Sequence, residues 1–479
     1  MEFETIIGLE VHAQMNTKAK MFCACDNDAW GKEPNTVVCP VCMGHPGTLP
    51  VPNRAVIEKA IRAAKALKCT VNRRNHFDRK NYFYPDLPAG FQISQYKFPL
   101  ASSGAMKFSV TDPKTLKSEP AECRILRLHI ENDAGKLTHR GNHSLCDYNR
   151  AGTPLMEIVT EPDLRSPKAA SCFAEELRRI LIAAGTSEAD MYKGMMRFDA
   201  SISLRPKGDF RLYPRVEIKN LNSFKALEKA LGYQEKVLRK LWEEGKPPDG
   251  ETTVGWIDEE ERTQMLRDKE SAADYRYFPE PDIPPLDLDE AFVASIISGM
   301  EKLPSEIKTA YTAMGLTEAE ATMLVDQPAL KERFDAIKAK IGDAKRASSL
   351  VLTQLVGFLN AHEKTMEEAP SVQEMVALAE AIHSGRINTN AGKEVLEKMV
   401  ISGKTPSEII KEEGMGRVSD PALLQKLVEE AIKQNPKAIE SYKAGKTAAL
   451  GAVVGWVMKQ TKGQADAVKV NDLLIEKLT

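Results

Sequence analysis

Four cysteines near the start of the chain have the clearest chemical potential. They form two close pairs separated by the thirteen residues 26–38, and they are Cys23, Cys25, Cys39 and Cys42. Two close pairs joined by a loop are the spacing of a tetrahedral zinc site, in which four thiolates saturate the ion. Two disulfides, or scattered buried thiols, are the alternatives. Since the sequence shows no secretory signal and cytosolic thiols stay reduced, the pattern favours structural Zn²⁺.

A glutamate and a histidine precede these cysteines on one predicted strand. Between residues 6 and 12, apolar and polar residues alternate with the period of a strand. Glu10 and His12 therefore share one face and could point into one site. Taken alone, they fit a water-facing strand edge equally well.

Four later segments repeat this alternation. Their polar members are Arg127, His129, Glu131, Glu157, Arg197, Asp199, Arg215, Glu217 and Lys219. One such strand is explained by a solvated sheet face. Five strands that carry short acids beside Arg and Lys instead predict one polar floor for Mg²⁺ and phosphate. Mg²⁺ takes carboxylate and phosphate oxygens, and the cations neutralise the remaining phosphate charge.

Two loops support a phosphate site. Residues 77–95 combine cations with aromatic residues in a segment bent by Pro and Gly, as expected of a binding loop. Residues 215–223 lead from a strand into a helix with Ser223 at its cap, and a helix N-terminus presents free N–H groups to an anion.

Length and composition limit the remaining possibilities. The 479 residues predict two to four domains at roughly 100–200 residues each. Because 66 basic and 68 acidic residues nearly balance, any nucleic-acid binding must come from a local patch. No apolar run is long enough to span a bilayer, and the acidic start has no signal or transit character, so we expect a cytoplasmic protein without membrane contact.

The chain divides into a mixed and a helical part. Strand-like alternation and all eight cysteines precede the four prolines of residues 279–285, which cannot continue a helix or a central strand. Helices are also expected there at residues 53–68 and 166–184. Beyond the prolines, helical periodicity dominates, with a capping box from Thr317 to Glu320. The fold class is therefore α+β followed by an all-α region.

Seven segments of the chain together resemble the B subunit of the aspartyl/glutamyl-tRNA amidotransferase family. They are residues 6–12, 77–95, 129–136, 149–152, 155–162, 216–224 and 274–281, and residues 445–463 are similar to the family's helical tail. The resemblance implies a glutamine-synthetase-like cradle domain with an antiparallel sheet (1–292, zinc knuckle at 23–42). It also implies an all-α helical linker (293–404) and a small all-α tRNA-binding tail (405–479).

The implied activity is a ligase reaction in protein biosynthesis. ATP phosphorylates the side-chain carboxylate of Glu mischarged on tRNA(Gln), or of Asp on tRNA(Asn), and ammonia then displaces phosphate to form the amide. In the family, an amidase, the A subunit, supplies ammonia from glutamine and a small C subunit joins the other two, which gives a heterotrimer.

Carried over residue by residue, Glu10, His12, Glu131 and Asp199 would hold Mg²⁺, with Glu157 nearby, as the catalytic set. Lys80, Arg150 and Lys219 are the candidate ATP and phosphate cations, because two anions must be brought together in the reaction. The expected cofactors are ATP, Mg²⁺ and structural Zn²⁺.

The tail is locally basic although the whole chain is nearly neutral. Four lysines of residues 441–465 are candidate tRNA contacts: Lys443, Lys446, Lys459 and Lys462. An ordinary solvated helix face is the alternative. For the whole chain, the competing interpretations are a stand-alone ligase that amidates a small acid and a non-catalytic zinc-containing RNA-binding protein. The tail argues against the first, and the acidic sheet face argues against the second, since carboxylates repel RNA.

Overall fold

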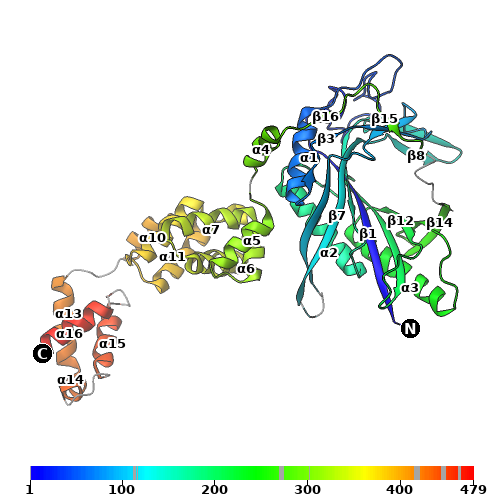
Figure 1. The fold of residues 1–479 in the computed structure, drawn as a ribbon. Helices are drawn as coiled ribbons and strands as arrows, with labels where there is room; N and C mark the ends of the chain where they lie inside the picture. Colours follow the sequence, from blue (N-terminus) through cyan, green and yellow to red (C-terminus); the bar gives the residue numbers. More distant parts are fainter. Residues whose placement is uncertain are drawn as a thin grey trace. The chain divides into compact units, whose positions relative to one another are not determined.

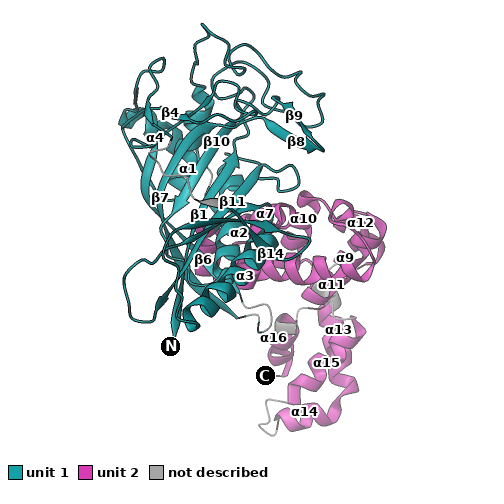
Figure 2. Ribbon diagram, turned by 90° about the vertical axis from the view of Figure 1, so that its right-hand side faces the viewer, with its two compact units in different colours: residues 1–304 teal, residues 305–479 magenta. Residues whose placement is uncertain are grey.

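The computed structural model describes residues 2–111, 115, 117–268, 275–300, 302–414, 421–443, 449–461, 465 and 467–478. The chain separates into two compact units, residues 1–304 and 305–479 (Figure 2). No helix among the described residues is both long and apolar enough to cross a membrane.

The first unit is organised around a nine-stranded sheet with the order β14-β13-β12-β11-β1-β10-β7-β6-β2 (Figure 1). The strands are β1 (Phe3–Gln14), β2 (Thr70–Val71), β6 (Ala101–Thr111), β7 (Ser118–Asn132), β10 (Pro154–Thr160), β11 (Met196–Pro206), β12 (Val216–Leu221), β13 (Thr252–Ile257) and β14 (Arg262–Asp268). The five strands expected to share a polar face are direct neighbours in it, in the order β12-β11-β1-β10-β7.

One pair departs from the expected antiparallel sheet. β12 and β13 are parallel, whereas the other neighbours in this sheet are antiparallel. The cause is the helix α3 (Phe224–Glu243), which connects the two strands. It carries the chain back along the sheet, so that β13 runs in the same direction as β12. The coarse expectation of α+β holds, and the sheet is mixed.

Helices cover one face of the sheet. They are α1 (Arg54–Ala66), α2 (Pro167–Ala183) and α3, and the ribbon shows α2 and α3 beside the strands (Figure 1). In β1 the core-facing Ile7, Leu9 and Val11 are buried, because strand alternation directs them toward these helices. The expected cap of α3 is confirmed, since Ser223 accepts a hydrogen bond from the N–H of Ala226. At residue 166, where the second helix was expected to begin, Ser166 accepts one from the N–H of Ala169 at the start of α2.

Small strand pairs make up the rest of the first unit. They are β4 (Asp78–Asn81) between β5 (Phe91–Ser94) and β15 (Phe278–Pro279), β3 (Arg74–Asn75) with β16 (Leu286–Asp287), and β8 (Lys136–Arg140) with β9 (His143–Asp147). The short helix α4 (Glu290–Ser298) also belongs to this unit. The expected binding loop of residues 77–95 contains β4 and β5. Ser94 of β5 connects this loop to the polar face of the large sheet by a hydrogen bond to Glu131.

The second unit is helical. Its elements are α5 (Pro304–Ala313), α6 (Glu318–Asp326), α7 (Pro328–Ile341), α8 (Ala344–Ser348), a π-helix (Ser349–Leu355), α9 (Val356–Ala361), a 3₁₀ turn (Met366–Glu368), α10 (Val372–His383), α11 (Thr389–Ser402), α12 (Pro406–Glu412), α13 (Pro421–Gln434), α14 (Pro436–Lys443), α15 (Leu450–Gln460) and α16 (Ala467–Leu478). The Thr317–Glu320 capping box is present.

The second unit contains two apolar clusters. One joins α5 to α12, and the other joins α13 to α16. Ile409 and Ile410 of α12 are buried in the first cluster. This placement groups α12 with the preceding helices, although residue 405 is where we expect the tail to begin.

Candidate active site on the polar face of the sheet

The strand register brings the predicted acids and histidines together. Glu10 of β1 lies opposite Asp199 of β11, and His12 lies opposite Glu157 of β10. Glu157 in turn lies opposite His129 of β7. We call these five residues together with Glu131 the carboxylate face. It is the side of the sheet that faces away from the helices, since the alternate residues form the core.

Five side chains of the carboxylate face, all except that of Asp199, are in close contact through the two histidines. The Nε2 atom of His12 is 3.4 Å from a Glu157 oxygen, 3.7 Å from Glu10 and 3.8 Å from Glu131. The Nε2 atom of His129 lies 3.5 Å from Glu131 and 3.4 Å from Glu157. Ser94 of β5 donates a hydrogen bond of 2.8 Å to Glu131, so the loop of residues 77–95 closes over the site.

Burial and neighbouring charges shift the pKa values of the carboxylate face. Burial and the neighbouring Glu157 carboxylate raise the pKa of Glu10 to about 7. Burial alone would lower the pKa of His12, but Glu157, Glu10 and Glu131 raise it to about 9. Burial would raise the pKa of Glu157, yet His129 and His12 hold it well below its usual range. The face therefore has an excess of negative charge that two imidazolium groups only partly balance.

Two lysines flank this charge. Lys219 of β12 lies 3.7 Å from Asp199 and 3.4 Å from Glu217. The Nζ atom of Lys80 lies 4.8 Å from the centre of the Tyr275 ring. Burial alone would lower the pKa of Lys80, but Glu131 and other neighbours, Glu157 among them, hold it above its ordinary value. Both ammonium groups therefore stay charged beside the carboxylates.

The third predicted cation is already engaged. Arg150 donates hydrogen bonds to the carbonyl oxygens of Ala134 and Gly135, and its Nε lies 3.5 Å from Asp133. Arg197 binds the other oxygen of Asp133 at 3.0 Å. Arg150 thus holds the segment that follows β7, and it is less available to a phosphate than Lys80 or Lys219.

The four predicted zinc cysteines are also assembled. Their sulfur atoms all lie within 4.8 Å of one another, and those of Cys39 and Cys42 are 3.8 Å apart. Tetrahedral Zn²⁺ with bonds of about 2.3 Å places its sulfur ligands about 3.8 Å apart. A hydrogen bond with Cys23 is the main cause that lowers the pKa of Cys42 to about 5, and the Lys20 ammonium contributes. We call residues 23–42 the cysteine knuckle.

Of the predicted tail lysines, one side chain is described. Lys459 is exposed near the end of α15. Lys446 and Lys462 lie outside the described residues, as does the side chain of Lys443, the last residue of α14.

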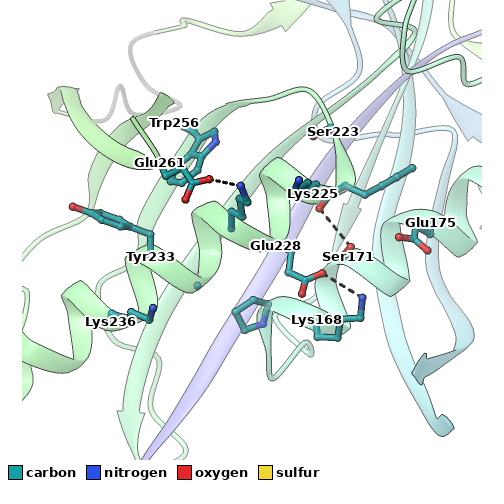
Figure 3. A pocket seen from close by; sticks show the side chains of 14 residues that line it. Lys168, Ser171, Glu175, Ser223, Lys225, Glu228, Tyr233, Lys236, Trp256 and Glu261 are labelled. Carbon is teal, nitrogen blue, oxygen red and sulfur yellow. Dashed lines mark hydrogen bonds and ion pairs between the residues drawn. The ribbon is translucent and has the colours of Figure 1, made fainter. Parts of the chain in front are cut away.

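A hollow lies on the opposite, helical side of the sheet. It has a volume of about 880 Å³ and is lined by α2 and α3, with lysines and glutamates around it (Figure 3). Lys168 is paired with Glu228 at 3.3 Å, and Lys229 is paired with Glu261. The lining contains four lysines and three glutamates, so the hollow lacks the excess negative charge of the carboxylate face.

Sequence patterns missed part of this arrangement. The alternation placed His129 on the predicted polar floor beside Glu131, but it gave His129 no role in the site, whereas the structure pairs it with Glu131 and Glu157. Asp133 follows the end of β7, outside any alternating run, and its partnership with Arg197 depends on the order of strands that only the fold reveals.

Comparison with known proteins shows the family to which the chain belongs. A family described as "GatB/GatE catalytic domain" matches residues 5–294, and one described as "GatB domain" matches residues 332–478. The chain belongs to the GatB family. All members of the carboxylate face and the cysteine knuckle fall within the first match, and α13 to α16 fall within the second.

Curated relatives match the chain from end to end. The protein of Persephonella marina is 44% identical over 482 residues and that of Moorella thermoacetica is 43% identical over 485 residues, each covering 100% of both chains. The protein of Thermotoga sp. (strain RQ2) is 41% identical over 486 residues, which cover 100% of this chain and 99% of the relative. All three are named as the B subunit of an aspartyl/glutamyl-tRNA(Asn/Gln) amidotransferase.

Proposed function

We propose that this chain is the amidating subunit of a tRNA-dependent amidotransferase. It acts on Glu carried by tRNA(Gln) and on Asp carried by tRNA(Asn), the substrates that the relatives' name indicates. The observation that carries the proposal is the carboxylate face, where four acids and two flanking lysines converge inside the family's catalytic domain. Such a face suits ATP-dependent activation of a carboxylate better than direct binding of RNA, which it would repel.

Mg²⁺ fits the donor set on this face. Glu10, His12, Glu131 and Asp199 would hold the ion, with Glu157 beside them, and His12 would release the proton that its raised pKa retains in the absence of the ion. The support is the burial and the neighbouring Glu157 carboxylate, which together raise the pKa of Glu10 to about 7, because a divalent cation would stabilise the charged form of such carboxylates. Bound there, Mg²⁺ supplies positive charge to the phosphate oxygens of ATP. His12 contacts three glutamates, so it also fixes their orientation.

The chain's own cations would then assist two successive steps. In the first, the side-chain carboxylate of the aminoacyl group attacks the γ-phosphorus of ATP, an acyl phosphate forms and ADP leaves. Lys80 and Lys219 lower the repulsion between these two anions. In the second, ammonia attacks the acyl carbon, phosphate leaves with the bonding electrons, and the amide forms after loss of a proton. Arg150 supports the site through Asp133.

Zn²⁺ fits the cysteine knuckle. Cys23, Cys25, Cys39 and Cys42 would saturate the ion, and the 3.8 Å spacing of two sulfur atoms supports this donor set. The role is structural, since four thiolates leave no position for a substrate.

The family also suggests partners and a location. The chain is proposed to work in a cytoplasmic heterotrimer with an amidase, the A subunit, which supplies ammonia, and with a small C subunit. Support comes from the relatives' name, which denotes one component of a larger enzyme that acts on tRNA.

The proposed architecture is a glutamine-synthetase-like cradle (1–292), a helical linker (293–404) and a tRNA-binding tail (405–479). The separate apolar cluster of α13 to α16 supports an independent tail. A deletion that tests it should begin at residue 415, because removing Ile409 and Ile410 would open the core of the preceding helices. The truncated enzyme should show a strongly raised KM for aminoacyl-tRNA and an unchanged KM for ATP.

A single lysine refines the tail test. Lys459→Ala should raise the KM for aminoacyl-tRNA and lower the slope of log KM against log salt by up to about one, since each phosphate contact releases counterions. The exposed Lys393 of α11 provides the matched control, Lys393→Ala. Equal salt slopes for both variants would assign Lys459 to solvent.

The proposed function is tested by amidation of purified Glu-tRNA(Gln) and Asp-tRNA(Asn), with the partner subunits and glutamine, each with and without ATP. Amide formation that requires both ATP and aminoacyl-tRNA is expected. Equally efficient amidation of free glutamate would indicate a ligase for small acids.

A further inference from the structure

Lys20 is a buried lysine next to the cysteine knuckle. It is 0% exposed, and its Nζ donates hydrogen bonds of 2.8 Å to the carbonyl oxygens of Val37 and Ala151. Its third close neighbour is the Cys42 sulfur at 3.8 Å. Within the described part of the chain, no carboxylate is paired with this ammonium group.

A buried ammonium group needs an anion. Two neutral carbonyls accept from two of its three N–H donors, but removal of its charge from water is costly unless an opposite charge compensates it. The only nearby source of negative charge among its contacts is the sulfur cluster. Four thiolates around one Zn²⁺ carry a net charge of −2, because four charges of −1 add to one of +2. One ammonium group at Cys42 would halve that charge.

The same lysine joins the knuckle to the segment that carries Arg150. Val37 lies between the two cysteine pairs, and its N–H donates to Asn149 at 2.8 Å. Ala151 follows Arg150 directly, and the N–H of Gly152 donates to the carbonyl of Asp133 at 2.9 Å. Lys20 therefore connects the cysteine knuckle, through Val37, with the segment that carries Arg150, through Ala151.

We propose that Lys20 is the buried counter-charge of a zinc tetrathiolate and a positioning residue that fastens the knuckle to residues 149–152. This rests on the proposed zinc site. The lysine holds Zn²⁺ more tightly by stabilising the charged thiolates, as partners of metal ligands do. It does not touch the reacting groups.

The test uses the complete complex. Zinc content is measured first by elemental analysis of the wild type. The transfer of Zn²⁺ to a coloured chelator is then followed for the wild type, Lys20→Met and Lys18→Met. Lys18 is exposed and close in sequence, which makes it the matched control. We expect the zinc affinity of Lys20→Met to fall by roughly 10–100-fold and that of Lys18→Met to stay unchanged.

A spectroscopic readout separates charge compensation from simple loss of packing. In Co²⁺-loaded protein, removal of the ammonium group should shift the thiolate-to-metal charge-transfer bands, whereas Lys18→Met should leave them in place. If Lys20→Met does not fold, the same measurements are made on Lys20→Gln, which keeps a donor without the charge. A metal-free wild type would refute the zinc site itself. Wild-type zinc with equal release and identical bands in the Lys20 and Lys18 variants would refute only the role of Lys20.

Discussion

The carboxylate face and the cysteine knuckle are both candidate metal sites, yet their environments are opposite. In the knuckle, four soft sulfur donors surround one point and a lysine compensates their charge. On the carboxylate face, hard oxygen donors are spread over neighbouring strands, and burial together with the Glu157 carboxylate raises the pKa of Glu10 to about 7. A closed donor set keeps its ion for structure. An open, overcharged set can accept an ion together with the phosphates of a substrate.

Replacing a central acid should have the largest effect. Glu131 contacts His12, His129 and Ser94, so Glu131→Gln removes a charge from the middle of the carboxylate face while keeping its shape. Amidation should fall by on the order of a hundredfold or more, because stabilisation of the phosphoryl-transfer step is lost. ADP release that depends on Glu-tRNA is the measurement.

The control for this variant is Glu122→Gln, which lies on the same strand and is exposed. Glutamine hydrolysis by the amidase partner should persist in both variants. Equal amidation by the two would remove Glu131 from the site and weaken the distinction between the two regions.

The next largest effect is expected for a flanking cation. Lys80→Met removes an ammonium group whose pKa Glu131 and Glu157 hold above its ordinary value against the effect of burial. The KM for ATP should rise, or kcat fall, by roughly 10–100-fold, the size of a charged hydrogen bond. Lys97→Met, at an exposed position just after the loop of residues 77–95, is the control. If both variants behave alike, the positive charge at residue 80 has no part in phosphate binding.

Breaking the knuckle should affect stability more than chemistry. Cys39→Ser is expected to lose the one equivalent of Zn²⁺ and to lower the free energy of unfolding by on the order of a few kcal/mol. Amidation per folded molecule should change far less than in Glu131→Gln. Metal analysis and thermal unfolding are the measurements, with Cys172→Ser as control because Cys172 lies in α2, away from the cluster. Full zinc retention in Cys39→Ser would contradict the donor set.

Local features of the structure were predicted from the sequence better than contacts between distant segments. Alternation is a local property, so it correctly placed Glu10, His12, Glu131 and Asp199 on one face of neighbouring strands. The helix cap at Ser223 is also local, and it was confirmed. Contacts between distant segments were not accessible. Lys20 with Ala151, Asp133 with Arg197, and the parallel pairing of β12 with β13 all depend on how the chain is folded back.

The smallest lasting effect is expected for brief treatment of the complex with a chelator, because loss of Mg²⁺ from the carboxylate face should be reversible and the cysteine knuckle should keep its Zn²⁺. Mg²⁺ bound by carboxylates and water exchanges rapidly, while Zn²⁺ held by four thiolates has no open position for an attacking ligand. Brief treatment with EDTA should therefore abolish amidation, and Mg²⁺ alone should restore it completely. Zinc content and the thermal midpoint should remain those of the untreated complex. A need for added Zn²⁺ to recover activity would show that the knuckle is open or that it takes part in the reaction, and the contrast between a closed structural site and an open chemical one would then fail.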